Sequence, residues 1–274
     1  VKDSSMFADS TKSFFVVEDD NFNIQPAEYN DNPEWVKNGN IYLLFFKAFT
    51  PEGTISAAIP NLEYIKSMGF NIIWVLPITE VSGDIDNQIN IGYYTKDFFK
   101  VEPSLGTEED YKNFVDAAHA LGIKVIQDIT PNHTGNVHPF AIEASLAEGY
   151  SQYWNYYQTE SIPHNTNGLG ECVTPEGIYY YCAFSDVLLN YDWSDLDAQK
   201  YMIDVYKYWV NEFGIDGYRF DVYWGPHRKY GEEAMGIPVR TELKHIKPDI
   251  LLLGEDDGVG TGTEVLYADK NGGL

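Results

Sequence analysis

The chain has 274 residues, of which 44% are hydrophobic and 15% aromatic, a composition typical of a globular protein with a sizeable core. Its 42 acidic residues against 18 Lys and Arg give a formal net charge of -24, which disfavours nucleic acid and anionic membranes as partners. No apolar run reaches the length of a membrane span, so membrane insertion is not expected. A neutral polymer carries no such electrostatic penalty.

The pattern of the chain changes near residue 36. Residues 1–35 are acidic and rich in Asn, and we interpret them as an N-terminal extension without catalytic residues. Two nearly continuous apolar runs follow, at 41–46 and 71–76, and each predicts a strand buried on both faces of a parallel sheet. A helix is predicted between them, from 59 to 68.

The clearest local signal is a helix that begins at Thr107 and ends at Gly122. Thr107 is predicted to be the N-cap, with Asp110 three residues later, and apolar residues then recur at helical spacing. Residues 124–129 form the third predicted strand. Because strands and helices alternate, residues 36–130 are predicted to be the first part of a parallel α/β domain.

Residues 131–192 show no strong helical period, and we interpret this long stretch as an inserted subdomain. It contains both cysteines, Cys172 and Cys182. A Pro-Glu-Gly turn between short β-prone arms could join them as a hairpin disulfide; two free thiols are the alternative. A disulfide would indicate an oxidising compartment, so a secreted, periplasmic or cell-surface location is expected over a cytoplasmic one.

The alternation of strands and helices resumes after residue 192. An amphipathic helix is predicted at 195–213, a strand at 217–221, a further helix at 239–246 and a strand at 250–255. Repeated strand-helix-strand units imply right-handed crossovers and a parallel sheet. Residues 193–274 are therefore predicted to continue the same domain, with five strands in all.

Charged residues interrupt three of the buried strands, each time near the carboxyl end. Asp128 ends the third strand, Arg219 and Asp221 the fourth, and Glu255 the fifth. The carboxyl ends of a parallel barrel meet on one face, where barrel enzymes place their active sites. Buried charges are costly unless they pair or do chemistry, so a structural salt bridge between Arg219 and Asp221 is the alternative to a catalytic role.

Two carboxylates with different roles are what retaining glycoside hydrolysis requires. Asp221 lies two residues from Arg219 on the same face of a strand, and the guanidinium would favour an ionised nucleophile. Glu255 follows an apolar run, and partial desolvation would favour its protonated form, which suits a general acid.

From about Trp35 onward the chain resembles the α-amylase family of glycoside hydrolases. Six segments match family motifs in the right order, at 69–77, 92–97, 106–107, 128–133, 217–221 and 254–255. The resemblance implies a (β/α)8 TIM-type barrel with a domain B-like insertion after strand three. It also implies action on the α-glucosidic bonds of starch-like α-glucans or maltooligosaccharides.

The resemblance implies a role for each matching residue. Asp221 is similar to the family's nucleophile and Glu255 to its acid/base. Arg219 and His133 are similar to contacts around the cleaved sugar, and Asp128 to the aspartate that organises the site. Tyr93 is similar to the platform on which that sugar stacks.

No cofactor is implied for catalysis, but the resemblance makes a structural calcium ion possible. Asn132 matches a position that binds calcium in many members, and 189–192 is a loose match to the usual partner sequence. Trp224 and Gly225 stand where many amylases have Lys and His, so Trp224 is a candidate for stacking on a sugar there, or for packing.

The family's third catalytic aspartate has no match before Leu274. Without the first 35 residues and the insertion, about 180 residues remain, against about 250 for a complete barrel. We therefore expect a barrel truncated after about five strands. The alternatives to a hydrolase are a transglycosylase of the same family and a non-catalytic glucan-binding fragment.

Overall fold

The computed structural model describes residues 32–83, 85, 91–160, 172–174, 176–182 and 184–256, together with an antiparallel pair of short strands, β1 (Val16–Glu18) and β2 (Ile24–Pro26). Most of the predicted N-terminal extension, and the end of the predicted second barrel segment after residue 256, lie outside the described residues. The predicted domain boundaries stay predictions.

The centre of the molecule is a five-stranded parallel sheet, in the order β13-β12-β7-β4-β3. Its strands are β3 (Ile41–Leu44), β4 (Ile72–Val75), β7 (Lys124–Ile129), β12 (Gly217–Phe220) and β13 (Leu251–Gly254). The five predicted strands are confirmed, and each barrel strand lies beside the next one along the chain. This arrangement is part of a (β/α)8 barrel, as predicted.

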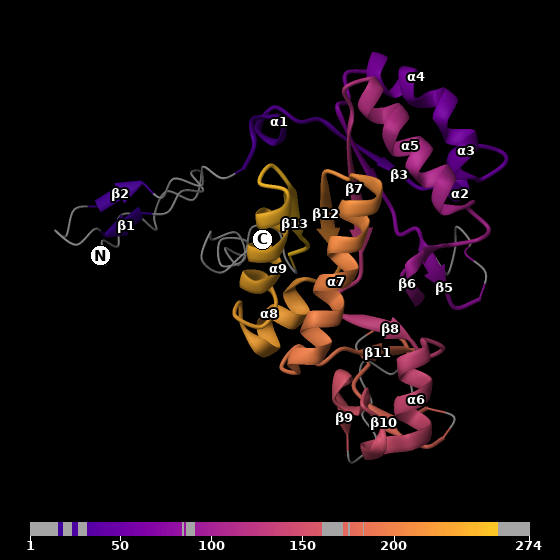
Figure 1. Cartoon of the computed structure of the whole chain (residues 1–274), viewed down its shortest axis with the longest axis vertical. Helices are drawn as coiled ribbons and strands as arrows, with labels where there is room; N and C mark the ends of the chain where they lie inside the picture. Colours follow the sequence, from indigo (N-terminus) through magenta and orange to yellow (C-terminus); the bar gives the residue numbers. More distant parts are fainter. Residues whose placement is uncertain are drawn as a thin grey trace.

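Helices follow the barrel strands and cover the sheet (Figure 1). The helices before β7 are α1 (Glu34–Lys37), α2 (Phe46–Phe49), α3 (Ile55–Ala58), the 3-10 turn η2 (Ile59–Asn61), α4 (Leu62–Ser67) and α5 (Glu108–Ala120). Those after the insertion are α7 (Leu196–Phe213), α8 (Trp224–Tyr230) and α9 (Gly236–Ile246). A hairpin of β5 (Thr79–Val81) and β6 (Thr95–Val101) follows β4.

The ends of the long helices are set by the expected residues. Thr107 and Asp110 form a reciprocal capping box at the start of α5, which confirms the predicted N-cap. Asp195 accepts hydrogen bonds from the first-turn amides of α7, and Gly214 ends that helix in the left-handed conformation, with φ of 74°.

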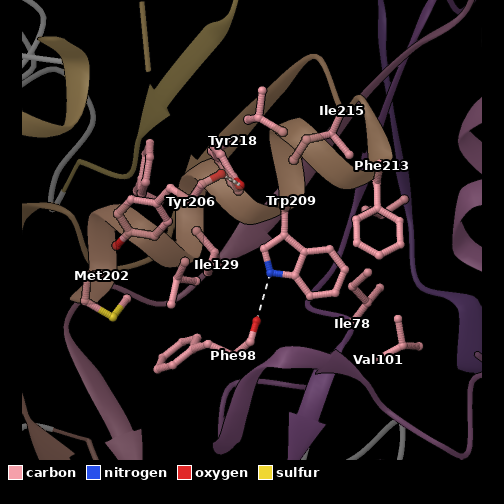
Figure 2. Close-up of a cluster of buried hydrophobic side chains, with 14 of the residues drawn as sticks. Ile78, Phe98, Val101, Ile129, Met202, Tyr206, Trp209, Phe213, Ile215 and Tyr218 are labelled. Atoms are coloured by element: carbon pink, nitrogen blue, oxygen red, sulfur yellow. Dashed lines mark hydrogen bonds between the residues drawn. The ribbon is translucent and has the colours of Figure 1, made fainter. Parts of the chain in front are cut away.

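The apolar side of α7 packs onto the sheet and onto β6 (Figure 2). Met202, Tyr206, Trp209 and Phe213 are all buried. The Trp209 indole donates a hydrogen bond of 2.8 Å to the carbonyl of Phe98, so its one polar atom is satisfied inside the core. This packing fixes the helix that leads into β12.

The insertion leaves the barrel after β7 and forms a separate layer (Figure 1). β8 (His133–Gly135) pairs with β11 (Leu188–Asn190), and β9 (Thr159–Glu160) pairs with β10 (Tyr179–Tyr180). The rest is α6 (Pro139–Ala147) with the turns η3 (Glu148–Tyr150) and η4 (Trp154–Tyr156). Cys172 and Cys182 form a disulfide with a Cα–Cα distance of 6.0 Å. Of the two alternatives, the hairpin disulfide is therefore present, and not two free thiols.

Two expectations about the first strand were wrong. The first strand ends at Leu44, because Phe46 already begins α2, and it is not buried on both faces: Ile41 and Leu43 are 41% and 53% exposed. Both residues lie on the edge strand of the sheet, where they pair in register with Ile72 and Trp74 of β4. The insertion contains a helix, α6, whose apolar residues lie on several faces, with Ile142 and Leu146 exposed; this agrees with the absence of a strong helical period in 131–192.

Asp216 is a buried and paired acid just before β12, at the amino ends of the barrel strands. It is 1% exposed, and its carboxylate binds His119 at 2.6 Å, Lys124 at 2.8 Å and the Val125 amide at 3.0 Å. Burial opposes ionisation, but these hydrogen bonds outweigh it and lower the pKa of Asp216 to about 2. The stabilisation is therefore present above about pH 4 and is lost as the pH falls towards 2.

We predict that Asp216→Asn lowers the free energy of unfolding at pH 7 by about 3 kcal/mol, because it leaves buried donors without their charge partner. Urea denaturation at pH 7 and pH 3 measures this, and the deficit should shrink at pH 3. Asp204→Asn is the matched control: Asp204 pairs with Lys200 on the surface, so its cost should stay below about 1 kcal/mol. Equal costs for the two variants would contradict the prediction.

Candidate active site

Strand register brings the charged residues together at the carboxyl end of the sheet. Arg219 on β12 is paired with Asp128 on β7 and with Leu253 on β13. The pairing continues past the strands, because the Asp221 amide donates to the Ile129 carbonyl and the Glu255 amide to the Phe220 carbonyl. Asp221 and Glu255 therefore end neighbouring strands.

The Arg219 guanidinium binds all three carboxylates. Its Nη1 lies 3.1 Å from Asp128 Oδ1 and 2.7 Å from Asp221 Oδ1, and its Nη2 lies 2.5 Å from Glu255 Oε1. The side chains of Arg219, Asp128 and Asp221 are 9%, 0% and 13% exposed, whereas Glu255 is 34% exposed. The structure thus brings together the four charged residues that were predicted to meet at this end of the sheet. The Arg219–Asp221 salt bridge and the candidate catalytic pair, Asp221 and Glu255, belong to one cluster.

Asp128 is held by neutral donors as well as by Arg219. The Trp74 indole donates to its Oδ2 at 2.9 Å and the Tyr93 hydroxyl at 3.1 Å. The guanidinium also lies 5.3 Å from the centre of the Trp74 ring. With every carboxylate oxygen engaged, Asp128 is placed to hold Arg219 and Tyr93 in position.

Burial raises the pKa of both aspartates of the cluster, an effect that the sequence pattern did not predict. It raises the pKa of Asp221 to about 6, although Arg219 opposes the shift, and the nearby Glu255 carboxylate adds to it. Burial also raises the pKa of Asp128 against the same guanidinium. Arg219 therefore limits the pKa of Asp221 but does not bring it below the ordinary range; at neutral pH Asp221 is still mainly ionised.

His133 is buried and neutral, because desolvation lowers its pKa to about 4. Its Nε2 lies 3.2 Å from the Tyr93 carbonyl oxygen, which can only accept, so Nε2 carries the proton. Its Nδ1 then accepts from the Asn132 amide nitrogen at 3.2 Å. His133 thus connects the start of the insertion to the segment that carries Tyr93.

The surroundings of Asn132 fit calcium poorly. Calcium takes six to eight oxygen ligands, usually with carboxylates among them. The amide nitrogen of Asn132 is directed to His133, so its side chain offers a single oxygen. Close by, the Lys229 ammonium donates to the side-chain oxygen of Gln158. In the part of the chain that the structure describes, no group of three or more His, Cys, Asp or Glu residues could hold a metal. Calcium at Asn132 stays a prediction.

A pocket of about 340 Å³ opens over the charged cluster. It is lined by Tyr93, Tyr94, His133, Phe184, Ser185, Leu188, Asp221, Val222, Trp224 and Glu255. Tyr93, His133 and Trp224 therefore face the same space as Asp221 and Glu255. Arg219 and Asp128 lie beneath it.

Five lining residues of this pocket were not predicted from the sequence as site residues: Tyr94, Phe184, Ser185, Leu188 and Val222. Phe184 comes from the aperiodic insertion, where no pattern marks it. Val222 follows Asp221 and has φ of 52°, a left-handed conformation that β-branched residues rarely adopt. Its amide donates to Glu255 Oε2 at 2.6 Å, so this unusual turn fixes the second oxygen of the Glu255 carboxylate.

A parallel β/α sheet with its charged cluster at the carboxyl ends of the strands is the architecture of a barrel enzyme. The model of the α-amylase catalytic domain matches residues 5–233, so the chain belongs to the α-amylase family. None of the described helices is long and apolar enough to cross a membrane.

Several relatives are similar over most of this chain. Alpha-amylase 3 from Dictyoglomus thermophilum is 30% identical over 236 residues, covering 82% of this chain and 44% of the relative. An oligo-1,6-glucosidase from Heyndrickxia coagulans is 28% identical, covering 69% of this chain and 36% of its own length. The solved α-amylase from H. orenii superposes with a TM-score of 0.70 at 28% identity, covering 86% of this chain and 51% of its own. The chain spans about half the length of these relatives, or less.

We predict that Arg219→Gln lowers the free energy of unfolding by about 3 kcal/mol or more, because three carboxylates would then face one another without a cation. The loss should shrink as the pH falls below about 6, where Asp221 becomes protonated. Urea denaturation across this range measures it. Arg228→Gln, which changes an exposed arginine on α8, should cost less than about 1 kcal/mol. A loss that does not change with pH would contradict the prediction.

Proposed function

We propose that the protein is a retaining glycoside hydrolase that cleaves α-glucosidic bonds in starch-like α-glucans or maltooligosaccharides. One observation carries this proposal: Asp221 and Glu255 bind the same guanidinium and line the same pocket. The relatives named as amylases and glucosidases support the choice of α-glucosidic substrates.

In this proposal Asp221 attacks the anomeric carbon while Glu255 protonates the departing glycosidic oxygen. A glycosyl-Asp221 ester forms, and Glu255 then takes a proton from the water that hydrolyses it. We favour retention because Asp221 and Glu255 bind the same guanidinium, and retaining enzymes hold their two carboxylates close together, roughly 5–5.5 Å apart against roughly 6.5–9.5 Å in inverting enzymes.

The other predicted residues take supporting roles. Tyr93 would stack beneath the sugar, and its hydroxyl donates a hydrogen bond to Asp128. Neutral His133 lines the same pocket and holds the Tyr93 backbone. A transglycosylase would use the same ester with a sugar hydroxyl in place of water. The disulfide supports a location in an oxidising compartment, outside the cytoplasm.

We predict that Asp221→Asn reduces kcat/KM on maltooligosaccharides by about 10⁴-fold or more, because the amide is not a nucleophile. Reducing-sugar release from maltotetraose and starch measures this, and circular dichroism shows whether the variant is folded. Asp204→Asn, which removes a surface carboxylate on α7 that does not line the pocket, should leave kcat/KM within about twofold.

Unchanged turnover in Asp221→Asn would remove Asp221 from its role. Wild-type protein that binds maltotetraose without releasing product would instead support a glucan-binding protein. Products longer than the substrate would indicate transglycosylation.

The pH profile of kcat/KM gives an independent prediction. The nucleophile must be ionised, and burial raises the pKa of Asp221 to about 6. Activity should therefore rise about tenfold per pH unit below pH 6, until Asp221 is ionised. A profile that is already flat at pH 5 would contradict the assignment.

A further inference from the structure

We propose that Val222 is a positioning residue for the general acid: its backbone N–H holds Glu255 Oε2 as the oxygen without a proton, so that Oε1 carries the proton for the departing oxygen. The inference rests on the proposed glycosidase function, and it assigns a role to a residue that no sequence motif marks. Three features carry it: the hydrogen bonds of Glu255, the left-handed turn after Asp221 and the packing around this turn.

Both oxygens of the Glu255 carboxylate are engaged by donors. Arg219 Nη2 lies 2.5 Å from Oε1, and the Val222 amide nitrogen lies 2.6 Å from Oε2. The backbone of Glu255 is tied to the same segment, because its amide donates to the Phe220 carbonyl at 3.0 Å and its carbonyl accepts from the Trp224 amide at 3.4 Å. The side chain is 34% exposed and lines the pocket, so a substrate can reach it while these contacts hold it.

A general acid carries a proton on one of its two oxygens. A backbone N–H and a guanidinium only donate, so each favours an oxygen that has no proton. One of the two contacts must therefore give way when Glu255 is protonated. If Oε1 is released, Arg219 keeps its bonds to Asp128 and Asp221 through Nη1. If Oε2 is released, the N–H of Val222, a residue that is 6% exposed, loses the hydrogen bond that satisfies it. The proton therefore belongs on Oε1.

The proposed proton transfers then use the same oxygen throughout. Asp221 bonds to the anomeric carbon, the electron pair of the breaking C–O bond stays on the glycosidic oxygen, and this oxygen takes the proton from Glu255 Oε1. Glu255 becomes a carboxylate, and Oε1 returns to the contact with Arg219 that the structure shows. When water attacks the glycosyl ester, Oε1 accepts a proton from that water. Oε2 stays on the Val222 amide in every step.

The Val222 N–H reaches Glu255 because the chain turns sharply after the nucleophile. The Asp221 amide still pairs with the Ile129 carbonyl at 2.8 Å, as in the sheet. The next residue, Val222, has φ of 52°, which is unfavourable for a β-branched side chain. Such strain persists where the surroundings fix the backbone, and it is frequent at active sites. This turn therefore connects the nucleophile directly to the general acid.

Close packing on both sides holds the turn. The Gly225 amide donates to the Val222 carbonyl at 2.9 Å. A Cβ atom on Gly225 would lie 2.6 Å from Asn132 Oδ1, and one on Gly254 would lie 2.7 Å from the ring of Tyr223. Glycine at these two positions lets the turn lie against the insertion and against the end of β13. This packing fixes the direction of the Val222 N–H.

A turn that serves only the fold would give a different kinetic pattern. Losing a structural hydrogen bond lowers stability and affects all substrates alike. Losing the hydrogen bond that positions the general acid slows only substrates whose leaving group needs a proton. Maltotetraose has such a leaving group, because a sugar departs as its hydroxyl form. α-Maltosyl fluoride has none, because fluoride departs as an ion. For both substrates kcat/KM reports formation of the glycosyl-enzyme, so the two values can be compared.

The experiment replaces Val222 by 2-hydroxyisovalerate, which keeps the isopropyl side chain and exchanges the N–H for an ester oxygen. The kcat/KM for maltotetraose should fall roughly 10- to 100-fold, because general acid catalysis contributes about 10²- to 10⁴-fold and is partly lost when the acid is misplaced. The kcat/KM for α-maltosyl fluoride should stay within about threefold. Glu255→Gln should show the same split to a larger extent.

The matched control is the same ester at Val101. Its N–H also donates to a glutamate, Glu108 Oε1 at 3.2 Å, but Val101 does not line the pocket. This ester should change kcat/KM for both substrates by less than about twofold. If the Val222 ester does not fold, Val222→Gly decides, since glycine keeps the N–H and adopts φ of 52° readily. Both values can then fall with the lost side chain, but their ratio should stay within about threefold of wild type. A ratio that falls as in Glu255→Gln would overturn the proposal.

The outcomes separate this inference from the proposed function. Equal losses on both substrates in the Val222 ester, or no loss on maltotetraose, would overturn the inference while Glu255→Gln still shows the split. Wild-type protein that cleaves neither substrate, or Glu255→Gln without the split, would overturn the proposed function, and this inference with it.

Discussion

The pairing of one guanidinium with three carboxylates is the interaction on which this site depends. Asp128, Asp221 and Glu255 end three neighbouring strands, and without Arg219 their charges would repel one another in a poorly solvated space. Burying such a cluster is costly, so the cluster alone says little about stability. What it provides is position: two carboxylates are held beside each other at the floor of a pocket.

The rest of the fold holds the two carboxylates in this position. The parallel register sets Arg219 beside Asp128, and the core between α7 and the sheet fixes the strand that carries Arg219 and Asp221. Trp74 and Tyr93 complete the hydrogen bonds of Asp128. Val222 accepts an unfavourable backbone conformation, and that turn directs its amide to Glu255.

Features that depend on the local sequence pattern could be predicted from the sequence. The apolar runs located all five barrel strands, Thr107 and Gly122 located α5, and the spacing of Arg219 and Asp221 placed both on one face of a strand. The sequence could not predict what depends on pairing between distant segments. Three features follow from how the strands and the insertion meet in space: the contact of Arg219 with Glu255, the place of Phe184 in the pocket lining, and the exposure of Leu43. The helix α6 was missed because its apolar residues do not lie on one face.

The central claim is that Asp221 is the nucleophile, and trapping the glycosyl-enzyme tests it most directly. The protein would be incubated with 5-fluoro-α-D-glucosyl fluoride and analysed by intact mass and peptide mapping. The account predicts a mass increase of one fluoroglucosyl group, located on Asp221. A label on Glu255 or on any other residue, or turnover of the reagent with no label at all, would contradict it.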